Sequence, residues 1–180
     1  MICWLTGLPS SGKTTLGTAV VELLQASGRK AELLDGDVVR REFWPELGFT
    51  KEDREENVRR LGMLAGTISR QGIAVVSAVS PYRASRDLIR QESEDFLEIY
   101  VNAPLSVCER RDVKGMYRKA RTGEIPTFTG VSDPYEAPLD PDVECRTDLE
   151  TIEESIAKIM QAIALTLQPM EQFAGGGDGI

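Results

Sequence analysis

The sequence predicts an α/β protein in which a parallel sheet carries helices on both faces. Three observations lead to this fold class. Apolar runs short enough for strands alternate along the chain with stretches whose apolar residues recur at helical spacing. The run "IAVVSAVS" at 73–80 is typical of a central parallel strand that is covered on both sides. The glycine-rich stretch "GLPSSGKTT" at 7–15 lies between a strand pattern and a helix pattern.

The first elements follow from local patterns. Residues 2–6 are expected to form a short buried strand, and residues 13–26 a helix whose apolar side chains recur at helical spacing. A second strand is expected over 30–37. The short stretch 38–45 is expected to form a helix that Pro45 stops, because proline cannot continue a helix.

The middle of the chain repeats this alternation. A longer helix is expected to begin at Thr50, with Asp53 placed as the acidic partner of a capping box, and Gly72 is expected to break it. The central strand 73–80 follows. A helix over about 83–93 comes next, and these elements extend the predicted sheet and its helical layers.

The next elements are a strand and a charged helical region. The strand "FLEIYVN" spans 96–102, and Pro104 is expected in the first turn of the following helix. Residues 110–121 are predicted to be a basic helical stretch, since six of these twelve residues are Lys or Arg. In a chain of net charge −8 this stretch is a local reversal of sign.

The C-terminal part is predicted to be a loop and one helix. Residues 122–146 are rich in Pro and Gly and are expected to be a loop, and 149–164 are expected to form the last helix. We expect a single domain over 1–166. Residues 167–180 end in "GGGDGI", which cannot supply a core, so we expect a flexible tail there.

The bulk composition excludes several classes of protein. The chain has 180 residues, of which 41% are hydrophobic, and a net charge of −8, which argues against broad contact with nucleic acid or an anionic membrane. No apolar run approaches the ~20 residues of a membrane span. We expect no signal peptide, and the three scattered cysteines favour a reducing cytoplasm. The absence of histidine excludes a histidine base.

Residues 7–15 carry the first functional motif. The stretch fits G-x-x-x-x-G-K-[ST], the phosphate loop of the P-loop NTPase fold. Its backbone N–H groups would hold a polyanion at a helix N-terminus, Lys13 would reach the β and γ phosphates, and Thr14 would place a hydroxyl on Mg²⁺. The predicted nucleotide-binding residues are Gly7, Leu8, Pro9, Ser10, Ser11, Gly12, Lys13, Thr14 and Thr15.

Two carboxylates follow the second predicted strand. Asp35 and Asp37 flank a glycine, where they could hold Mg²⁺ through water and accept a proton from an attacking hydroxyl. The alternative is an ordinary Asp-Gly turn. With the phosphate loop upstream, the pair suits a kinase of a small hydroxyl compound better than a GTPase.

Basic side chains give a further signal. The stretch 110–121 could close over a phosphoryl-transfer site and neutralise developing charge, or it could be a solvated helix face. Arg54 and Asn57 share one face of a helix and, with Arg40 and Arg59, could clamp an anionic second substrate. The alternative for this second set is an exposed ion-pair network.

These motifs resemble those of the adenylyl-sulfate kinase family, whose members phosphorylate adenosine 5′-phosphosulfate at its ribose 3′-hydroxyl. The resemblance covers nearly the whole chain apart from the C-terminal tail. It lies in the segments "GLPSSGKTT" (7–15), "LDGDVVR" (34–40), "LGFTKEDREENVRR" (47–60), "SAVSPYRASRDLIR" (77–90), "VNAPLSVCERRDVKGMYRKAR" (101–121) and "FTGVSDPYEAP" (128–138).

The resemblance implies a role for each site. ATP would bind at the phosphate loop, Asp37 with Asp35 would hold Mg²⁺ beside Thr14, and Asp37 would orient or deprotonate the 3′-hydroxyl. The residues that would contact the phosphosulfate are Arg40, Arg54, Asn57 and Lys114. Phe49 and Phe128 would sandwich the adenine, which stacking stabilises.

Ser80 stands where some family members form a phosphoserine. Direct in-line transfer needs no such intermediate, so we expect Ser80 to contribute to the site by shaping the substrate pocket.

The expected product is 3′-phosphoadenylyl sulfate, made in sulfate assimilation. A homodimer and a functional link to an ATP sulfurylase are candidates by resemblance. Two rival functions differ from this one. The first is a kinase of the same fold for another nucleotide or sugar, and the second is a catalytically idle nucleotide-binding module that regulates a sulfurylase.

Overall fold

The computed structural model describes residues 1–167, and the predicted tail lies outside the described residues except for its first residue. The strands are β1 (Ile2–Thr6), β2 (Ala31–Asp35), β3 (Ile73–Ser77), β4 (Phe96–Asn102) and β5 (Val143–Arg146). The helices are α1 (Lys13–Ala26), α2 (Gly36–Phe43), α3 (Lys51–Ser69), α4 (Arg83–Gln91), α5 (Leu105–Arg111), α6 (Met116–Arg121) and α7 (Ile152–Thr166).

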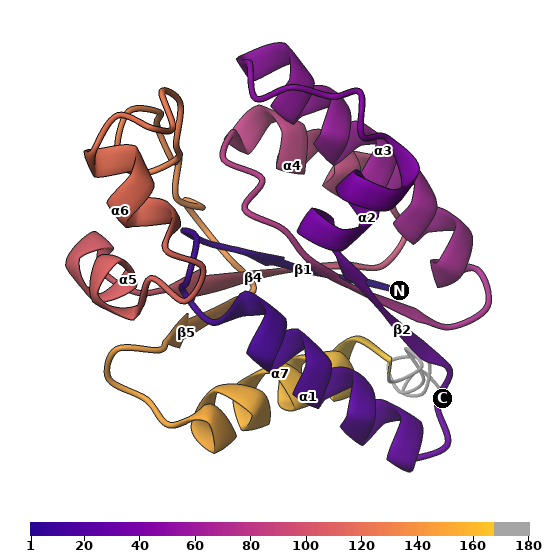
Figure 1. The fold of residues 1–180 in the computed structure, drawn as a ribbon. Helices are drawn as coiled ribbons and strands as arrows, with labels where there is room; N and C mark the ends of the chain where they lie inside the picture. The colour runs from indigo at the N-terminus through magenta and orange to yellow at the C-terminus, as the bar shows by residue number, and fades with distance from the viewer. Residues whose placement is uncertain (168–180) are drawn as a thin grey trace, which may run out of the picture.

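The strands form one parallel sheet with the order β2-β3-β1-β4-β5. Helices α1 and α7 cover one face, and α3 and α4 cover the other (Figure 1). The predicted fold class is therefore confirmed. None of the helices between residues 1 and 167 combines the length and the apolar character that a membrane-spanning helix needs.

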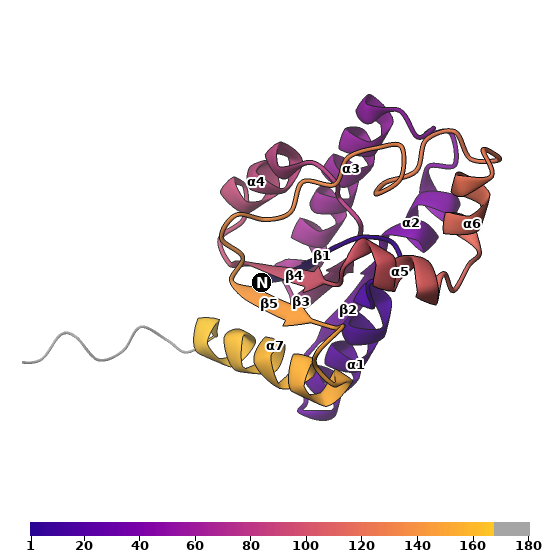
Figure 2. The same cartoon turned by 90° about the vertical axis from the view of Figure 1, so that its left-hand side faces the viewer.

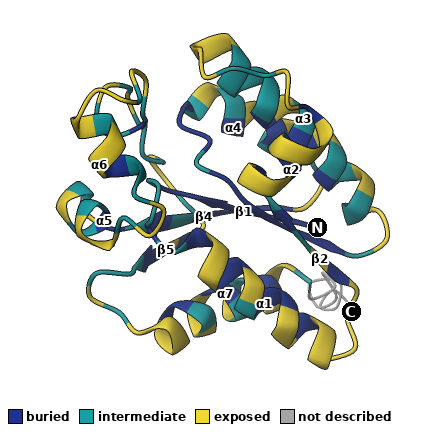
Figure 3. Ribbon diagram, in the orientation of Figure 1, coloured by how far each residue is buried: buried dark blue, intermediate teal, exposed yellow. Residues whose placement is uncertain are grey.

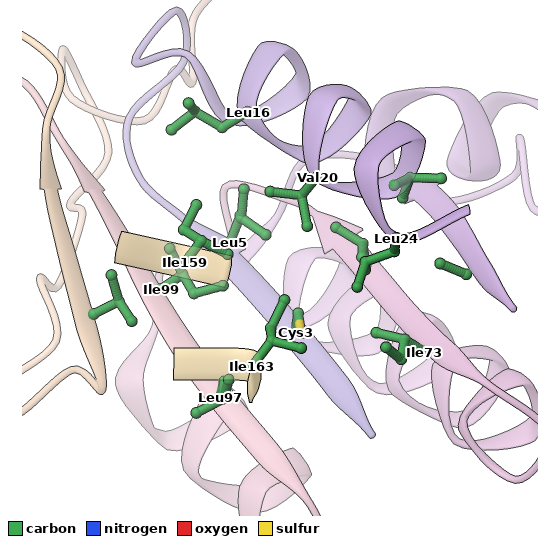
Figure 4. Close-up of a cluster of buried hydrophobic side chains, with 14 of the residues drawn as sticks. Cys3, Leu5, Leu16, Val20, Leu24, Ile73, Leu97, Ile99, Ile159 and Ile163 are labelled. Carbon is green, nitrogen blue, oxygen red and sulfur yellow. The ribbon is translucent and has the colours of Figure 1, made fainter. Parts of the chain in front are cut away.

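Each face of the sheet has its own core because successive side chains of a strand point to opposite sides. In β1, Cys3 and Leu5 pack in the cluster that contains side chains of α1 and α7, such as Val20 and Ile159 (Figure 4). The neighbouring Trp4 packs in the opposite cluster beneath α3. Strands β1 and β3 are accordingly buried along their whole length, while the outer faces of the helices are exposed (Figure 3).

Most predicted boundaries agree with the structure. The capping box at Thr50 and Asp53 is present, and α3 ends before Gly72. The second strand stops at Asp35, earlier than predicted, because the Asp35 side chain accepts hydrogen bonds from the backbone N–H groups of Asp37 and Val38 and so caps α2. Pro104 is the residue before α5, not part of its first turn.

The prediction of one continuous basic helix over 110–121 is wrong. Asp112 and Gly115 both have positive φ angles, of 21° and 66°, and they separate α5 from α6. The Asp112 carboxylate accepts hydrogen bonds from the backbone N–H groups of Tyr117 and Arg118, so it satisfies the start of α6. A left-handed turn therefore divides the stretch into two short helices.

The predicted loop over 122–146 was wrong at its end, where Val143–Arg146 forms β5. This strand pairs with β4 only, so it lies at the edge of the sheet, and its side chains alternate between buried and partly or fully exposed. Because this edge strand is short and carries charged residues such as Glu144, its hydrophobic periodicity is too weak to predict a strand from the sequence. The last helix starts at Ile152, not at 149, because Thr151 forms a capping box with Glu154.

The cysteines provide a first test of the packing. All three are buried free thiols, and burial raises the pKa of Cys3 to about 12 and that of Cys145 to about 11. We expect the folded protein to give no fast reaction with the thiol reagent DTNB at about pH 8. After unfolding in guanidinium chloride, all three thiols should react. A fast thiol in the folded protein would contradict this burial.

Candidate active site

The phosphate loop connects β1 to α1 at the carboxyl end of the sheet, where ligands bind in open α/β folds. Helices α2, α5 and α6 gather at this same end (Figure 2). Gly12 has a φ angle of 109°, which a side chain would strain, and it directly precedes α1. The loop therefore presents the N-terminus of a 14-residue helix to the site.

Lys13 bridges the two ends of this loop. Its Nζ donates to the carbonyl oxygens of Gly7 (3.0 Å) and Leu8 (2.8 Å), and the residue is only 8% exposed. Burial lowers the pKa of Lys13 to about 8, against opposing attraction from Asp37 and other negative groups nearby. A polyanion at the loop would stabilise the ammonium form, because its charge would offset the cost of burial.

The loop is also held from outside, by residues whose roles the sequence did not indicate. The carbonyl oxygen of Ser11 accepts from Thr147 Oγ1 (2.7 Å) and Arg111 Nη1 (3.2 Å). Arg111 Nη2 donates to the Thr147 carbonyl (2.5 Å), and Tyr117 donates its hydroxyl to Pro9 O (3.0 Å). Arg111 belongs to the basic stretch singled out in the sequence, but Thr147 follows the unpredicted strand β5.

The two aspartates have different neighbours. Asp35 Oδ2 accepts from the Thr14 hydroxyl at 2.7 Å, while its other oxygen caps α2. Asp37 lies in the first turn of α2, and its Oδ2 accepts from Lys114 Nζ at 2.6 Å. This hydrogen bond raises the pKa of Lys114. The Thr14 hydroxyl is thus paired with Asp35, whereas Asp37 faces the basic segment.

Oxygen donors suited to Mg²⁺ are therefore present, but only a few of them. Within residues 1–167, no three or more His, Cys, Asp or Glu side chains gather as a metal cage. Mg²⁺ is usually bound through one or two carboxylates plus substrate phosphates and water, so a hydroxyl beside one or two aspartates fits this ion.

A second part of the site lies between α3 and the segment after α6. The Phe49 ring is 57% exposed, and the guanidinium of Arg40 lies 4.2 Å from its centre. Phe128 packs edge-on against Tyr117, with ring centres 5.0 Å apart. Asn57 accepts from Trp44 Nε1 at 2.7 Å through its side-chain oxygen. Two aromatic rings from distant parts of the chain thus border one space.

This space and the phosphate loop form one cavity of about 1130 Å³. That volume exceeds the ~300–1,000 Å³ of an ordinary small-molecule site, so it has room for two ligands. The predicted site residues that line the cavity are Pro9, Ser10, Ser11, Gly12, Lys13, Thr14, Thr15, Asp35, Asp37, Arg40, Phe49, Arg54, Asn57, Ser80, Lys114 and Phe128.

Arg59 is the member of the proposed anion clamp that is absent from the lining. Its guanidinium binds Glu56 at 2.7 Å on the exposed side of α3. For this residue the alternative of an exposed ion pair holds, since positions 54 and 59 point to different sides of a helix. The remaining basic residues, Arg40 and Arg54, donate to loop carbonyl oxygens near Phe49.

Ser80 lies under the cavity with 3% of its surface exposed. Its Oγ accepts from Trp4 Nε1 (2.9 Å) and donates to Thr6 Oγ1 (3.2 Å), both on β1. The backbone of Ser80 has a positive φ angle of 39°. The hydroxyl is thus held by the sheet, and the role of Ser80 in shaping the pocket stays a prediction.

The chain is similar in sequence and in fold to known kinases. The model of the adenylylsulphate kinase family matches residues 1–146. The adenylyl-sulfate kinase of Picosynechococcus sp. is 58% identical over 161 residues, which cover 89% of this chain and 91% of that protein. The chain is also similar to the solved APS kinase CysC of Mycobacterium tuberculosis in complex with AMPPNP and APS. The TM-score is 0.87 and the identity 39%, over 91% of this chain and 96% of that one. A hexameric APS kinase from Thiobacillus denitrificans is 31% identical with a TM-score of 0.67, over 91% of this chain and 28% of that one.

Proposed function

The chain belongs to the adenylylsulphate kinase family, and from this premise we propose how its residues transfer the γ-phosphate of ATP to adenosine 5′-phosphosulfate. The acceptor is the ribose 3′-hydroxyl, and the products are 3′-phosphoadenylyl sulfate and ADP. One observation carries the proposal: the phosphate loop and the space between Phe49 and Phe128 belong to a single cavity large enough for two nucleotides. Donor and acceptor can therefore meet inside it.

ATP occupies the end of the cavity that residues 9–15 line; Gly7 and Leu8, also predicted to bind the nucleotide, are not part of this lining. The backbone N–H groups before α1 hold its phosphates, and Lys13 moves its ammonium from the loop carbonyls to the β and γ phosphates. Arg111 and Thr147 keep the loop in shape through the Ser11 carbonyl. The rest of the nucleotide extends along the lining from Thr147 to Ser155.

Thr14, Asp35 and Asp37 would hold Mg²⁺; Asp35 is hydrogen-bonded to Thr14, and Asp37 to Lys114. When bound, this ion neutralises charge on the transferring phosphoryl group. Asp37 orients the 3′-hydroxyl and accepts its proton, because its carboxylate is open to the cavity and not used as a helix cap. Lys114 moves from Asp37 toward the phosphate when the substrates bind, and so stabilises the transition state.

The acceptor occupies the other end. Its adenine stacks between Phe49 and Phe128, an arrangement that stabilises by on the order of 1–3 kcal/mol per face. Arg40, Arg54 and Asn57 border the same space and supply positive charge and a side-chain amide for the phosphosulfate. Transfer is direct and in line, so Ser80 carries no phosphoryl group and acts on the pocket's shape.

The test is ADP release with Mg-ATP and one acceptor at a time: adenosine 5′-phosphosulfate, AMP, adenosine or none. Turnover with the phosphosulfate alone supports the proposal. Turnover with AMP or adenosine but not with the phosphosulfate would support the rival kinase function. ATP binding with no turnover on any acceptor would support a regulatory nucleotide-binding module instead.

The aromatic stack gives a second prediction. Replacing Phe128 with Ala should raise the KM for the phosphosulfate about tenfold or more, because one stacking face is lost, and should change the KM for ATP little. Phe43→Ala is a matched control, since Phe43 is 66% exposed and outside the cavity lining. An equal loss for both substrates would assign Phe128 to the structure of its loop.

The broader expectations stay predictions. They are a single domain over 1–166, a homodimer, a functional link to an ATP sulfurylase, and a cytoplasmic location. Gel filtration of the protein with and without Mg-ATP would measure its oligomeric state.

A further inference from the structure

Arg54 joins two segments that are far apart in the sequence. Its Nε donates to the Phe49 carbonyl at 3.0 Å, and its two terminal nitrogens reach Thr129 Oγ1 (3.1 Å), Thr127 O (3.3 Å) and Asp133 Oδ2 (2.9 Å). We call Arg54 with these four acceptors the latch. It connects the start of α3 to the segment 127–133, so it spans the cavity from one aromatic ring to the other.

The latch is largely shielded from water. The side chains of Arg54 and Asp133 are 11% and 21% exposed, and Thr129 is 2% exposed. Screening by solvent is therefore weaker here than in the other ion pairs of α3, which are more exposed. An arginine in such a position needs nearby negative charge to offset the cost of leaving water.

The guanidinium of Arg40 increases the need for negative charge near Arg54. Arg40 also packs on the Phe49 ring, at 4.2 Å, and the Arg54 guanidinium lies 5.6 Å from the ring centre. Burial and then repulsion by Arg54 lower the pKa of Arg40. Asp53 and Asp37 oppose that shift at Arg40, whereas Asp133 is the carboxylate that pairs directly with Arg54 and so offsets the charge of that arginine beside Phe49.

Asp133 is rigidly connected to the second aromatic ring. The Phe128 carbonyl accepts from the backbone N–H groups of Val131, Ser132 and Asp133, and the Ser132 hydroxyl accepts from the Phe128 N–H. Gly130 N–H donates to the Asp133 carbonyl at 2.8 Å and closes the turn. A displacement of Asp133 would therefore also displace Phe128.

We propose that Asp133 is a positioning residue for the acceptor, which fixes the separation of Phe49 and Phe128 by holding Arg54. This inference rests on the proposed function, in which the two rings bracket the adenine. Asp133 touches no substrate in this account. It keeps the two rings in place on either side of the acceptor and keeps Arg54 oriented, so that the phosphosulfate meets a site that is already formed.

Asp133→Asn removes the charge and keeps the size of the side chain. We expect the KM for adenosine 5′-phosphosulfate to rise about tenfold, with kcat and the KM for ATP within about twofold of wild type. Asp140→Asn is the matched control, because Asp140 is an exposed carboxylate that, like Asp133, lies between α6 and β5, and it is outside the cavity lining. An unchanged or lower acceptor KM in Asp133→Asn would overturn the proposal.

A double-mutant cycle separates the latch from a general structural role. If Asp133 acts through Arg54, Asp133→Asn should have little further effect on the acceptor KM in an Arg54→Met background. Full additivity would overturn the proposal. Thr129→Val removes another acceptor of Arg54 at nearly constant volume, and it should raise the acceptor KM in the same direction, so the test stands even if Asp133→Asn fails to fold.

Limited proteolysis tests the latch independently of the acceptor. Arg121 lies in an exposed stretch before residue 127, and trypsin should cleave after it several-fold faster in Asp133→Asn than in wild type or Asp140→Asn. If the wild-type protein turned over none of the acceptors, the proposed function would be wrong. The proteolysis rates would still test whether Asp133 holds the latch. Equal cleavage rates in the three proteins would then overturn it.

Discussion

Asp37→Asn is expected to lower the rate constant of the chemical step by on the order of 10²–10⁴-fold while ATP still binds. The carboxylate lines the cavity, its Oδ2 lies 2.6 Å from Lys114 Nζ, and α2 does not need it as a cap. Asparagine keeps the shape but is a poor proton acceptor and carries no charge for Mg²⁺. Single-turnover ADP formation measures the step, and calorimetric titration with a non-hydrolysable ATP analogue measures binding.

Two further variants make this result specific. Glu42→Gln changes an exposed carboxylate of the same helix outside the cavity lining, and it should leave the rate constant unchanged. Asp35→Asn should mainly raise the Mg²⁺ concentration needed for half-maximal rate, because Asp35 is the neighbour of Thr14 and asparagine still caps a helix well. If Asp37→Asn retains activity within a few-fold of wild type, Asp37 is neither the base nor a metal residue.

Arg86→Met is expected to have the largest effect on stability, lowering the free energy of unfolding by about 3–5 kcal/mol. Arg86 is 1% exposed and its Nε donates to Glu98 Oε1 at 2.6 Å. Its terminal nitrogens donate to the carbonyl oxygens of Ser80 (2.6 Å) and Glu136 (2.7 Å). Removing the arginine leaves Glu98 charged and buried with only the longer contact to Arg90, at 3.6 Å.

Urea unfolding followed by tryptophan fluorescence measures this change. An m-value equal to that of wild type would show that unfolding exposes the same amount of surface in both proteins. Arg41→Met is the matched control, since Arg41 is an exposed partner of Glu42 and its side chain is 70% exposed. The double change Arg86→Met with Glu98→Gln should recover part of the loss, because the uncompensated charge is gone. A loss no larger than that of Arg41→Met would contradict a stabilising role for the buried pair.

The sequence alone determined the features that depend on near neighbours in the chain. The phosphate loop, the cap at Thr50 and the buried strand β3 each depend on residues within a few positions of one another, although β3 ends at Ser77 and not at the predicted residue 80. Helical and strand periodicity is equally local, so the parallel sheet and its helical layers could be predicted. The resemblance then supplied the reaction, and the phosphate-loop motif and the resemblance together supplied 16 of the 37 residues that line the cavity.

Two local features, β5 and the break between α5 and α6, were predicted wrongly because the residue pattern around each is typical of a different structure. β5 is a short edge strand, and its charged side chains alternate with buried ones in a segment otherwise rich in proline and glycine. The break at Asp112 depends on a side chain that bonds to backbone N–H groups five and six residues later. Neither feature changes the composition of its region enough to be recognised.

Only the tertiary structure decided how the functional groups divide their work. It placed Asp35 beside Thr14 and Asp37 beside Lys114, at sequence separations of 21 and 77 residues. It also turned Arg59 away from the cavity and gave Arg54 a partner 79 residues distant. Such pairings arise when parallel strands bring their carboxyl ends to one edge, and no spacing in the chain encodes which side chains then meet.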